Sequence, residues 1–165
     1  MTSRPHTLPP DPATYRTVLG HFATGVALIT AIDDGEPVGM ACNSFTSVSL
    51  DPQMVLFCAA KSSTTWPRMQ PAGKFAANIL GEDGEEVCRL FAEKGADRFS
   101  SLAYSRGRSG SPILRDALAW VDCNTIAEHD AGDHFIVVGE VLELGYQSEG
   151  KPLLFYRGGY GRFEI

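Results

Sequence analysis

The sequence has few of the residues that mark a metal site or a membrane span. Only 4 cysteines and 4 histidines occur among its 165 residues, and neither type recurs at the short spacing of zinc ligands. We therefore expect free or buried thiols in a reducing compartment and no bound metal. No apolar run approaches the roughly 18 residues of a membrane span, and the first residues contain no signal-peptide core. These absences favour a soluble, cytoplasmic protein.

Positive charge is also scarce. The 14 Lys and Arg residues are outnumbered by 20 Asp and Glu residues, which gives a net charge of −6. Because no basic cluster offsets this charge locally, we do not expect nucleic acid as a partner.

Several common catalytic motifs are missing as well. The sequence contains neither G-x-G-x-x-G nor G-x-x-x-x-G-K-[ST], so a Rossmann or P-loop nucleotide site is not expected. It also lacks H-E-x-x-H and G-x-S-x-G, which argues against a metalloprotease or an α/β-hydrolase. We accordingly assign no catalytic side chain from these patterns.

The length and the 44% hydrophobic content suit one domain with a buried core. We expect a mobile segment over residues 1–10 and a single domain over residues 11–165. Asp11 followed by Pro12 predicts a helix start. An apolar stripe then follows at i, i+3, i+4 and i+7, formed by Tyr15, Val18, Leu19 and Phe22. This stripe predicts that the helix packs against another surface.

The rest of the chain is dominated by short strand patterns separated by tight turns. The expected strands cover residues 26–32, 37–49, 53–60, 74–80, 120–128, 134–146, 152–156 and 160–164. Short helices are expected around Trp66 and over 83–92, and the connection 94–112 shows few periodic signals and is the expected mobile loop. The sequence therefore predicts a mostly β protein, with strands in an antiparallel meander or barrel.

One predicted strand is unusual in composition. The segment 39–52 (GMACNSFTSVSLDP) carries small and hydroxyl side chains where a packing strand would carry Val, Ile and aromatics. Taken alone, such a run is more often a solvated face. Short donors of this kind also suit a flat polar ligand with a phosphate, because the backbone comes close to the ligand.

Eight short motifs in one order carry a family resemblance that spans residues 13–165. They are FATGVALIT (22–30), NSFTSVSLDP (43–52), KFAANIL (74–80), RF (98–99), GSPIL (110–114), AW (119–120), GDHFIVVGEV (132–141) and PLLFYRGGYG (152–161). In this order the chain resembles the flavin reductase-like family, which feeds reduced flavin to two-component monooxygenases. The resemblance implies an FMN-binding split β-barrel with antiparallel, Greek-key-like strands, and a homodimer with flavin near the subunit interface.

The same resemblance implies a set of site residues. The flavin ring would lie along Gly39, Met40, Ala41, Cys42, Asn43, Ser44, Phe45 and Thr46, with backbone amides meeting its polar edge. The flavin phosphate would be bound by Ser47, Ser62, Ser63, Thr64 and Arg98. Asn78 would border the ring or the ribityl chain. His134 and Tyr160 would contact the nicotinamide, and Cys42 receives no catalytic role.

The activity that the resemblance implies is hydride transfer from NADH to FMN or FAD, with NADPH as a possible donor. Such chemistry belongs to the cofactors and needs no dedicated acid or base. A monooxygenase component would then be the partner. Two alternatives remain open at this point: a flavoprotein of the same fold that keeps its FMN and reduces another acceptor, and a non-catalytic flavin-binding protein.

Overall fold

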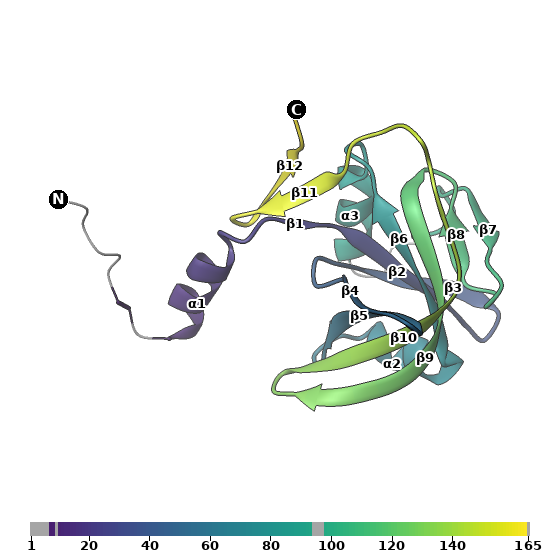
Figure 1. Cartoon of the computed structure of the whole chain (residues 1–165), viewed down its shortest axis with the longest axis horizontal. Helices are drawn as coiled ribbons and strands as arrows, with labels where there is room; N and C mark the ends of the chain where they lie inside the picture. The colour runs from purple at the N-terminus through teal and green to yellow at the C-terminus, as the bar shows by residue number, and fades with distance from the viewer. Residues whose placement is uncertain (1–6, 9, 94–97, 165) are drawn as a thin grey trace.

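The computed structural model describes residues 7–8, 10–93 and 98–164 (Figure 1). The expected mobile segment 1–10 lies mostly outside the described residues. The helices are α1 (Pro12–Leu19), α2 (Trp66–Met69), the 3₁₀ turn η1 (Gln70–Ala72) and α3 (Glu85–Ala92). The strands are β1 (Thr24–Gly25), β2 (Ala27–Asp33), β3 (Glu36–Cys42), β4 (Thr46–Leu50), β5 (Gln53–Ala60), β6 (Lys74–Leu80), β7 (Tyr104–Arg106), β8 (Pro112–Leu114), β9 (Ala117–Ala131), β10 (His134–Tyr146), β11 (Leu153–Tyr156) and β12 (Gly159–Arg162).

The main sheet has seven antiparallel strands in the order β3-β2-β6-β9-β10-β5-β4. The long β9–β10 hairpin occupies its middle and joins β6 on one side to β5 on the other (Figure 1). The expectation of a mostly β, antiparallel fold is confirmed. The barrel is not closed, because β3 and β4 form the two free edges of the sheet.

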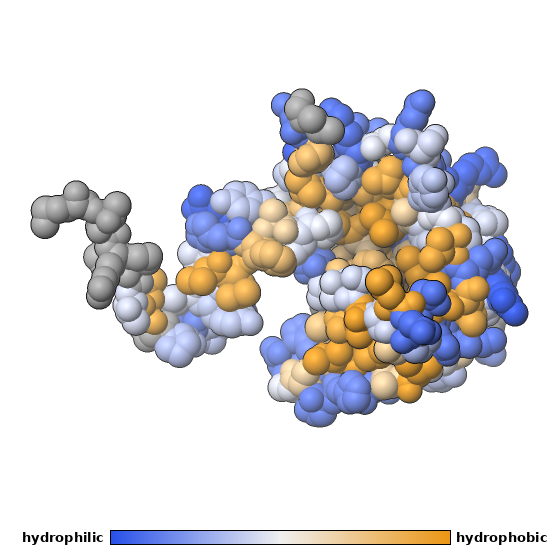
Figure 2. Space-filling model, in the orientation of Figure 1, coloured by the Kyte–Doolittle hydropathy of each residue, from blue (hydrophilic) through white to orange (hydrophobic). Residues whose placement is uncertain are grey.

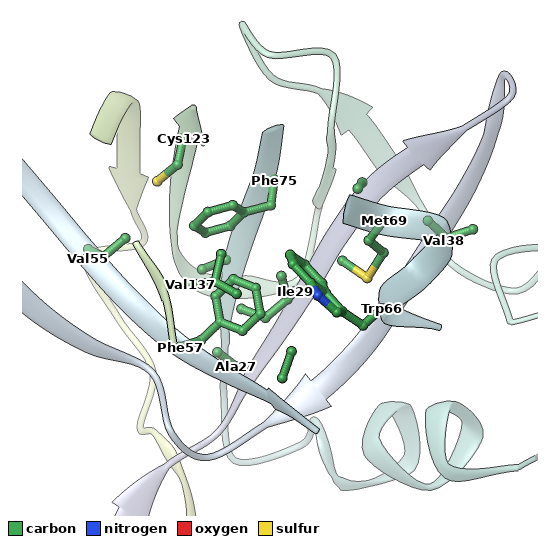
Figure 3. Close-up of a cluster of buried hydrophobic side chains, with 13 residues drawn as sticks. Ala27, Ile29, Val38, Val55, Phe57, Trp66, Met69, Phe75, Cys123 and Val137 are labelled. Carbon is green, nitrogen blue, oxygen red and sulfur yellow. The ribbon is translucent and has the colours of Figure 1, made fainter. Parts of the chain in front are cut away.

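The sheet curls around a core of large apolar side chains. The rings of Phe57 on β5 and Phe75 on β6 lie edge to face with centroids 5.0 Å apart, although two strands separate β5 from β6 in the sheet order (Figure 3). Trp66 and Met69 of α2 cover this core on one side. Gly139 on β10 lies directly beneath the Phe75 ring, where a Cβ would come within 2.5 Å of a ring carbon. A second buried cluster packs under α3 through Cys88 and Phe91.

Helix α1 confirms the predicted start but not the predicted packing. The Asp11 carboxylate accepts hydrogen bonds from the amides of Ala13 and Thr14 at 3.0 and 3.1 Å, as an N-cap does. No residue of α1 is buried, and the helix stands away from the sheet (Figure 1). The four side chains of its apolar stripe, Tyr15, Val18, Leu19 and Phe22, are each between 48% and 75% exposed.

The predicted strand 37–49 is wrong as one continuous element. The chain leaves β2 after Cys42 and joins β5 at Thr46, so β3 and β4 lie at opposite edges of the sheet. The Ser44 hydroxyl secures the crossing by accepting a hydrogen bond from the Cys58 amide at 2.9 Å. Hydrophobic alternation carries no signal for such a crossing, since both halves remain extended.

The expected loop 94–112 also contains structure, although residues 94–97 lie outside the described residues. Strands β7 and β8 pair with each other, and the turn between them is held by the buried carboxylate of Asp122. Asp122 accepts hydrogen bonds from the amide and the hydroxyl of Ser109. A Cβ at Gly107 would lie 2.8 Å from this carboxylate, so glycine is required for the close approach. Among the described helices, none is long and apolar enough to cross a membrane.

Candidate functional site

The candidate site begins at the opening between the two edges of the sheet. Strand β3 pairs only with β2 and strand β4 only with β5 in the described chain, so one side of each strand is free of ladder partners. The connection 43–45 runs between these two edges. Free strand edges present backbone N–H and C=O groups to whatever lies beside them. The opening therefore offers backbone donors to a flat polar ligand.

A small cavity lies at the end of β3. It measures about 150 Å³ and is lined by Val26, Ala41, Cys42, Asn43, Phe155 and Tyr160. Four of these six residues belong to the predicted set, and the structure brings them together from β3, the connection after it and β12. Val26 and Phe155 were not predicted, although both lie inside the family motifs FATGVALIT and PLLFYRGGYG.

The cavity fits part of a flavin ring but not a whole cofactor. Sites for small-molecule ligands usually enclose about 300–1,000 Å³, and this cavity is smaller than that range. Figure 2 shows the molecule hollowed between the β11–β12 hairpin and the β9–β10 hairpin, on the side that α1 faces. The lining is apolar at Val26 and Phe155 and polar at Asn43, as a ring with one polar edge requires.

Cys42 is protonated at this site. Burial raises the pKa of the Cys42 thiol to about 11, and hydrogen bonding with Ser44 offsets only part of this effect. A thiol with such a pKa is a poor nucleophile at neutral pH. The geometry therefore agrees with the prediction that Cys42 has no catalytic role.

Several residues of the predicted ring-binding segment are held in place by contacts within the fold. Gly39 lies under α3, where a Cβ would come within 3.0 Å of the Phe91 ring. Met40 and Phe45 pack against the main core. The side chain of Ser44 bonds to β5, as described above. These residues would meet a ligand through their backbone alone.

The predicted phosphate ligands divide into two groups. Ser47 on β4 and Ser62 and Thr64 just after β5 are exposed. The Ser63 hydroxyl is instead engaged just before α2, where it accepts hydrogen bonds from the amides of Thr65 and Trp66 at 3.2 and 3.1 Å. Arg98 lies beside α3, donates to the Glu93 carbonyl at 2.6 Å and sits over the Phe91 ring.

His134 lies at the same end of the sheet as residues 62–64. It is the first residue of β10 and pairs with Ala60, the last residue of β5. The Asp133 carbonyl accepts a hydrogen bond from the Lys61 amide at 2.9 Å, which ties the hairpin turn to the end of β5. The imidazole is 43% exposed. Of the predicted phosphate hydroxyls, those of residues 62–64 follow the end of β5 that pairs with His134, whereas Ser47 lies opposite Val55, five residues further along the sheet.

Tyr160 of β12 also lines the cavity at the end of β3. Its ring lies edge to face with Phe155 at a centroid distance of 5.6 Å. Partial burial raises the pKa of the Tyr160 hydroxyl, which stays protonated at neutral pH. The ring is therefore a neutral wall that a second aromatic ring can contact.

Asn78 departs from its predicted role. The side chain is fully buried, and its amide nitrogen donates to the carbonyls of Leu28 and Pro112 and to the Thr30 hydroxyl, each at 3.2 Å. Its amide oxygen accepts from the Leu114 amide at 2.8 Å. The side chain joins β2, β6 and β8, and no polar atom of it is left for a ligand.

Comparison with known proteins agrees with this geometry. The family model described as "Flavin reductase like domain" matches residues 19–164. A flavin reductase from Pseudomonas putida is 51% identical over 154 residues, covering 93% of this chain and 91% of that protein. The reductase subunit HsaB of a flavin-dependent monooxygenase from Rhodococcus jostii is 46% identical, covering 93% of this chain and 79% of that protein.

Solved structures give the same result. Nitrilotriacetate monooxygenase component B from Mycobacterium thermoresistibile superposes with a TM-score of 0.90 at 44% identity, covering 93% of this chain and 87% of that chain. The NADH:FAD oxidoreductase SgcE6 from Streptomyces globisporus, in complex with NAD and FAD fragments, has a TM-score of 0.90 at 35% identity, covering 96% of this chain and 97% of that chain. The chain belongs to the flavin reductase like domain family.

Proposed function

We propose that this protein is an NADH:flavin oxidoreductase that reduces FMN or FAD and supplies the reduced flavin to a monooxygenase component. The observation that supports the proposal is the pair of free sheet edges at β3 and β4, with a cavity at the end of β3 and His134 paired with the end of β5. The relatives support the same function, since HsaB is named as a reductase subunit and SgcE6 as an NADH:FAD oxidoreductase.

The residues of this chain have distinct tasks in the proposed site. The backbone of Ala41, Cys42 and Asn43 meets the polar edge of the flavin ring, and the hydroxyls of Ser47 and Thr64 bind its phosphate. Flavin and nicotinamide supply the hydride chemistry when bound. The protein's contribution is to hold the two rings in contact and to keep water out. NADPH is the alternative donor.

We also infer that the site is completed by a second copy of the chain. Figure 2 shows apolar surface on helix α1, next to the hollow between the two hairpins, and the stripe residues Val18 and Phe22 are 54% and 75% exposed. An apolar helix face without a partner marks an interaction surface. A homodimer would cover this face and add the missing wall of the flavin site.

The first test is anaerobic. Purified protein is mixed with NADH or NADPH in the presence of FMN or FAD, and loss of the oxidised flavin's visible absorbance is followed. Protein-dependent bleaching that saturates with added flavin supports the proposal and ranks the cofactors. Bound flavin that stays oxidised would overturn it in favour of a binding protein. Turnover of a yellow protein without added flavin would favour a tightly held cofactor and another acceptor.

His134→Ala is expected to raise the KM for NADH about tenfold, the effect of losing one polar contact and part of a ring surface. Flavin affinity should stay unchanged, because residues 41–43 and the phosphate hydroxyls remain. The measurement is steady-state kinetics with NADH varied at saturating flavin. His129→Ala is the matched control, since His129 is exposed on β9. Equal KM values in both variants would remove His134 from the nicotinamide site.

A further inference from the structure

The turn before β10 pairs His134 with an acidic neighbour. Asp133 Oδ1 lies 2.7 Å from His134 Nδ1. The Asp133 side chain is 94% exposed, so it contributes almost nothing to packing. Its contact with the imidazole is also of little use for stability, because exposed ion pairs contribute about 0–1 kcal/mol. Neither packing nor stability therefore accounts for the contact between Asp133 and His134.

The turn itself is held firmly in place. Gly132 adopts a left-handed conformation with φ of 69°, which lets the chain reverse between β9 and β10. The Lys61 amide donates a hydrogen bond to the Asp133 carbonyl. The Lys61 ammonium lies 2.6 Å from the Asp130 carboxylate and 5.2 Å from the centre of the Phe135 ring. These contacts hold the backbone of the turn in place. The orientation of the His134 ring and the position of its proton are then set by the contact with the Asp133 carboxylate.

An ionised carboxylate only accepts hydrogen bonds. The contact with His134 holds the pKa of the Asp133 carboxyl below its ordinary value, so the group is ionised at neutral pH. A neutral imidazole that contacts it through Nδ1 must therefore carry its proton on Nδ1. Nε2 is then an acceptor. Of the charged groups near the turn, Lys61 follows β5 and pairs with Asp130 of β9, and its charge also helps to lower the pKa of the Asp133 carboxyl.

We propose that Asp133 is a positioning residue that holds His134 as the Nδ1–H tautomer and presents Nε2 as an acceptor to the nicotinamide carboxamide. The proposal rests on the proposed function, because it assigns the nicotinamide contact to His134. The carboxamide NH₂ group is a donor, and an unprotonated Nε2 is its complement. The opposite tautomer would present an N–H group, which pairs with the carboxamide oxygen instead, so the carboxamide would have to turn over and the contact with its NH₂ group would be lost.

The proton position is tested directly by NMR of protein labelled with ¹⁵N-histidine, at about pH 8.5, where an ordinary imidazole is neutral. The His134 signals are assigned by their loss in His134→Ala. The wild type should show the Nδ1–H tautomer at His134, and Asp133→Ala should shift the ring toward Nε2–H. Asp130→Ala, which removes a carboxylate from the same hairpin, should leave the tautomer unchanged. An Nε2–H tautomer in the wild type would overturn the proposal.

Kinetics provide the second readout. Asp133→Ala should raise the KM for NADH about 3- to 10-fold, the effect of one hydrogen bond, with smaller changes in kcat and none in flavin affinity. An unchanged KM in an active enzyme would overturn the positioning role while leaving the proposed function intact. If the wild type fails to oxidise NADH, the proposed function fails instead. The NMR experiment needs neither flavin nor NADH, so the two failures are distinguishable.

Discussion

Asn78→Ala is expected to lower the free energy of unfolding by about 3 kcal/mol, because it leaves several buried groups without partners. Asn78 joins three strands: its amide bonds the Leu28 carbonyl of β2 and both the Pro112 carbonyl and the Leu114 amide of β8. None of these bonds is exposed to water that could replace it, since Asn78 is fully buried. Chemical denaturation monitored by tryptophan fluorescence measures the loss.

Gln53→Ala is the matched control, because it removes an amide from an exposed strand position and should change stability by less than about 0.5 kcal/mol. Flavin affinity, measured well below the melting temperature, separates the two roles assigned to Asn78. A variant that is less stable but binds flavin normally supports the structural role. A variant of normal stability with weak flavin binding would restore the original prediction of a ligand contact.

Replacing Val18 and Phe22 together with aspartate is expected to convert the proposed homodimer into a monomer. Burying a Val or Phe side chain contributes about 1.5–3 kcal/mol, and a carboxylate in the same interface is strongly unfavourable. Flavin affinity should fall with the oligomeric state, because the cavity of one chain provides only one wall and ligand sites usually bury roughly 70–90% of the ligand. Sedimentation velocity and flavin titration measure the two effects.

Ala13→Asp provides the control for charge. Ala13 lies on the face of α1 opposite the apolar stripe and is also exposed, so the added carboxylate should leave the oligomeric state unchanged. A double variant that remains dimeric would show that α1 is not the interface. A monomeric variant with unchanged flavin affinity would show that the site is complete within one chain.

Much of the fold was predictable because local signals and tertiary structure agree. The Asp34–Gly35 turn between β2 and β3 has both residues at positive φ, as the two-residue hairpin signal in the sequence requires. Strands β5, β6 and β10 have the predicted bounds, since each is a run of apolar or alternating residues ended by polar or turn residues. The short helix expected around Trp66 is α2, and the Trp66 ring packs against Phe57 with the ring centroids 5.6 Å apart.

The missed features depend on partners distant in the sequence. The predicted strand is interrupted at residues 43–45, where the Ser44 hydroxyl accepts a hydrogen bond from the Cys58 amide. The β7–β8 turn is held by a hydrogen bond from the Ser109 amide to the Asp122 carboxylate. A hydroxyl in an extended segment gives no sign of which distant amide it will meet. For the same reason, sequence patterns could not separate Ser63, whose hydroxyl accepts a hydrogen bond from the Trp66 amide, from its exposed neighbours Ser62 and Thr64.

The candidate site was predicted from motifs, and the structure refines it by showing which side chains are already engaged. Ala41, Cys42, Asn43 and Tyr160 do line one cavity. Asn78 belongs to the same motif set because the fold needs it, so a family motif alone does not distinguish a ligand contact from a structural residue. Burial and hydrogen-bond partners make that distinction.

The central position of the β9–β10 hairpin has a consequence for synthesis of the chain. The first 80 residues form two sets of paired strands, β3-β2-β6 and β5-β4. No strand of one set is hydrogen-bonded to a strand of the other. Residues 117–146 must emerge from the ribosome before the two groups become one sheet. The hairpin pairs locally, whereas its flanking contacts are distant in sequence, and distant contacts form slowly. The nascent chain therefore holds two unjoined sheet fragments with open edges until its last third is made.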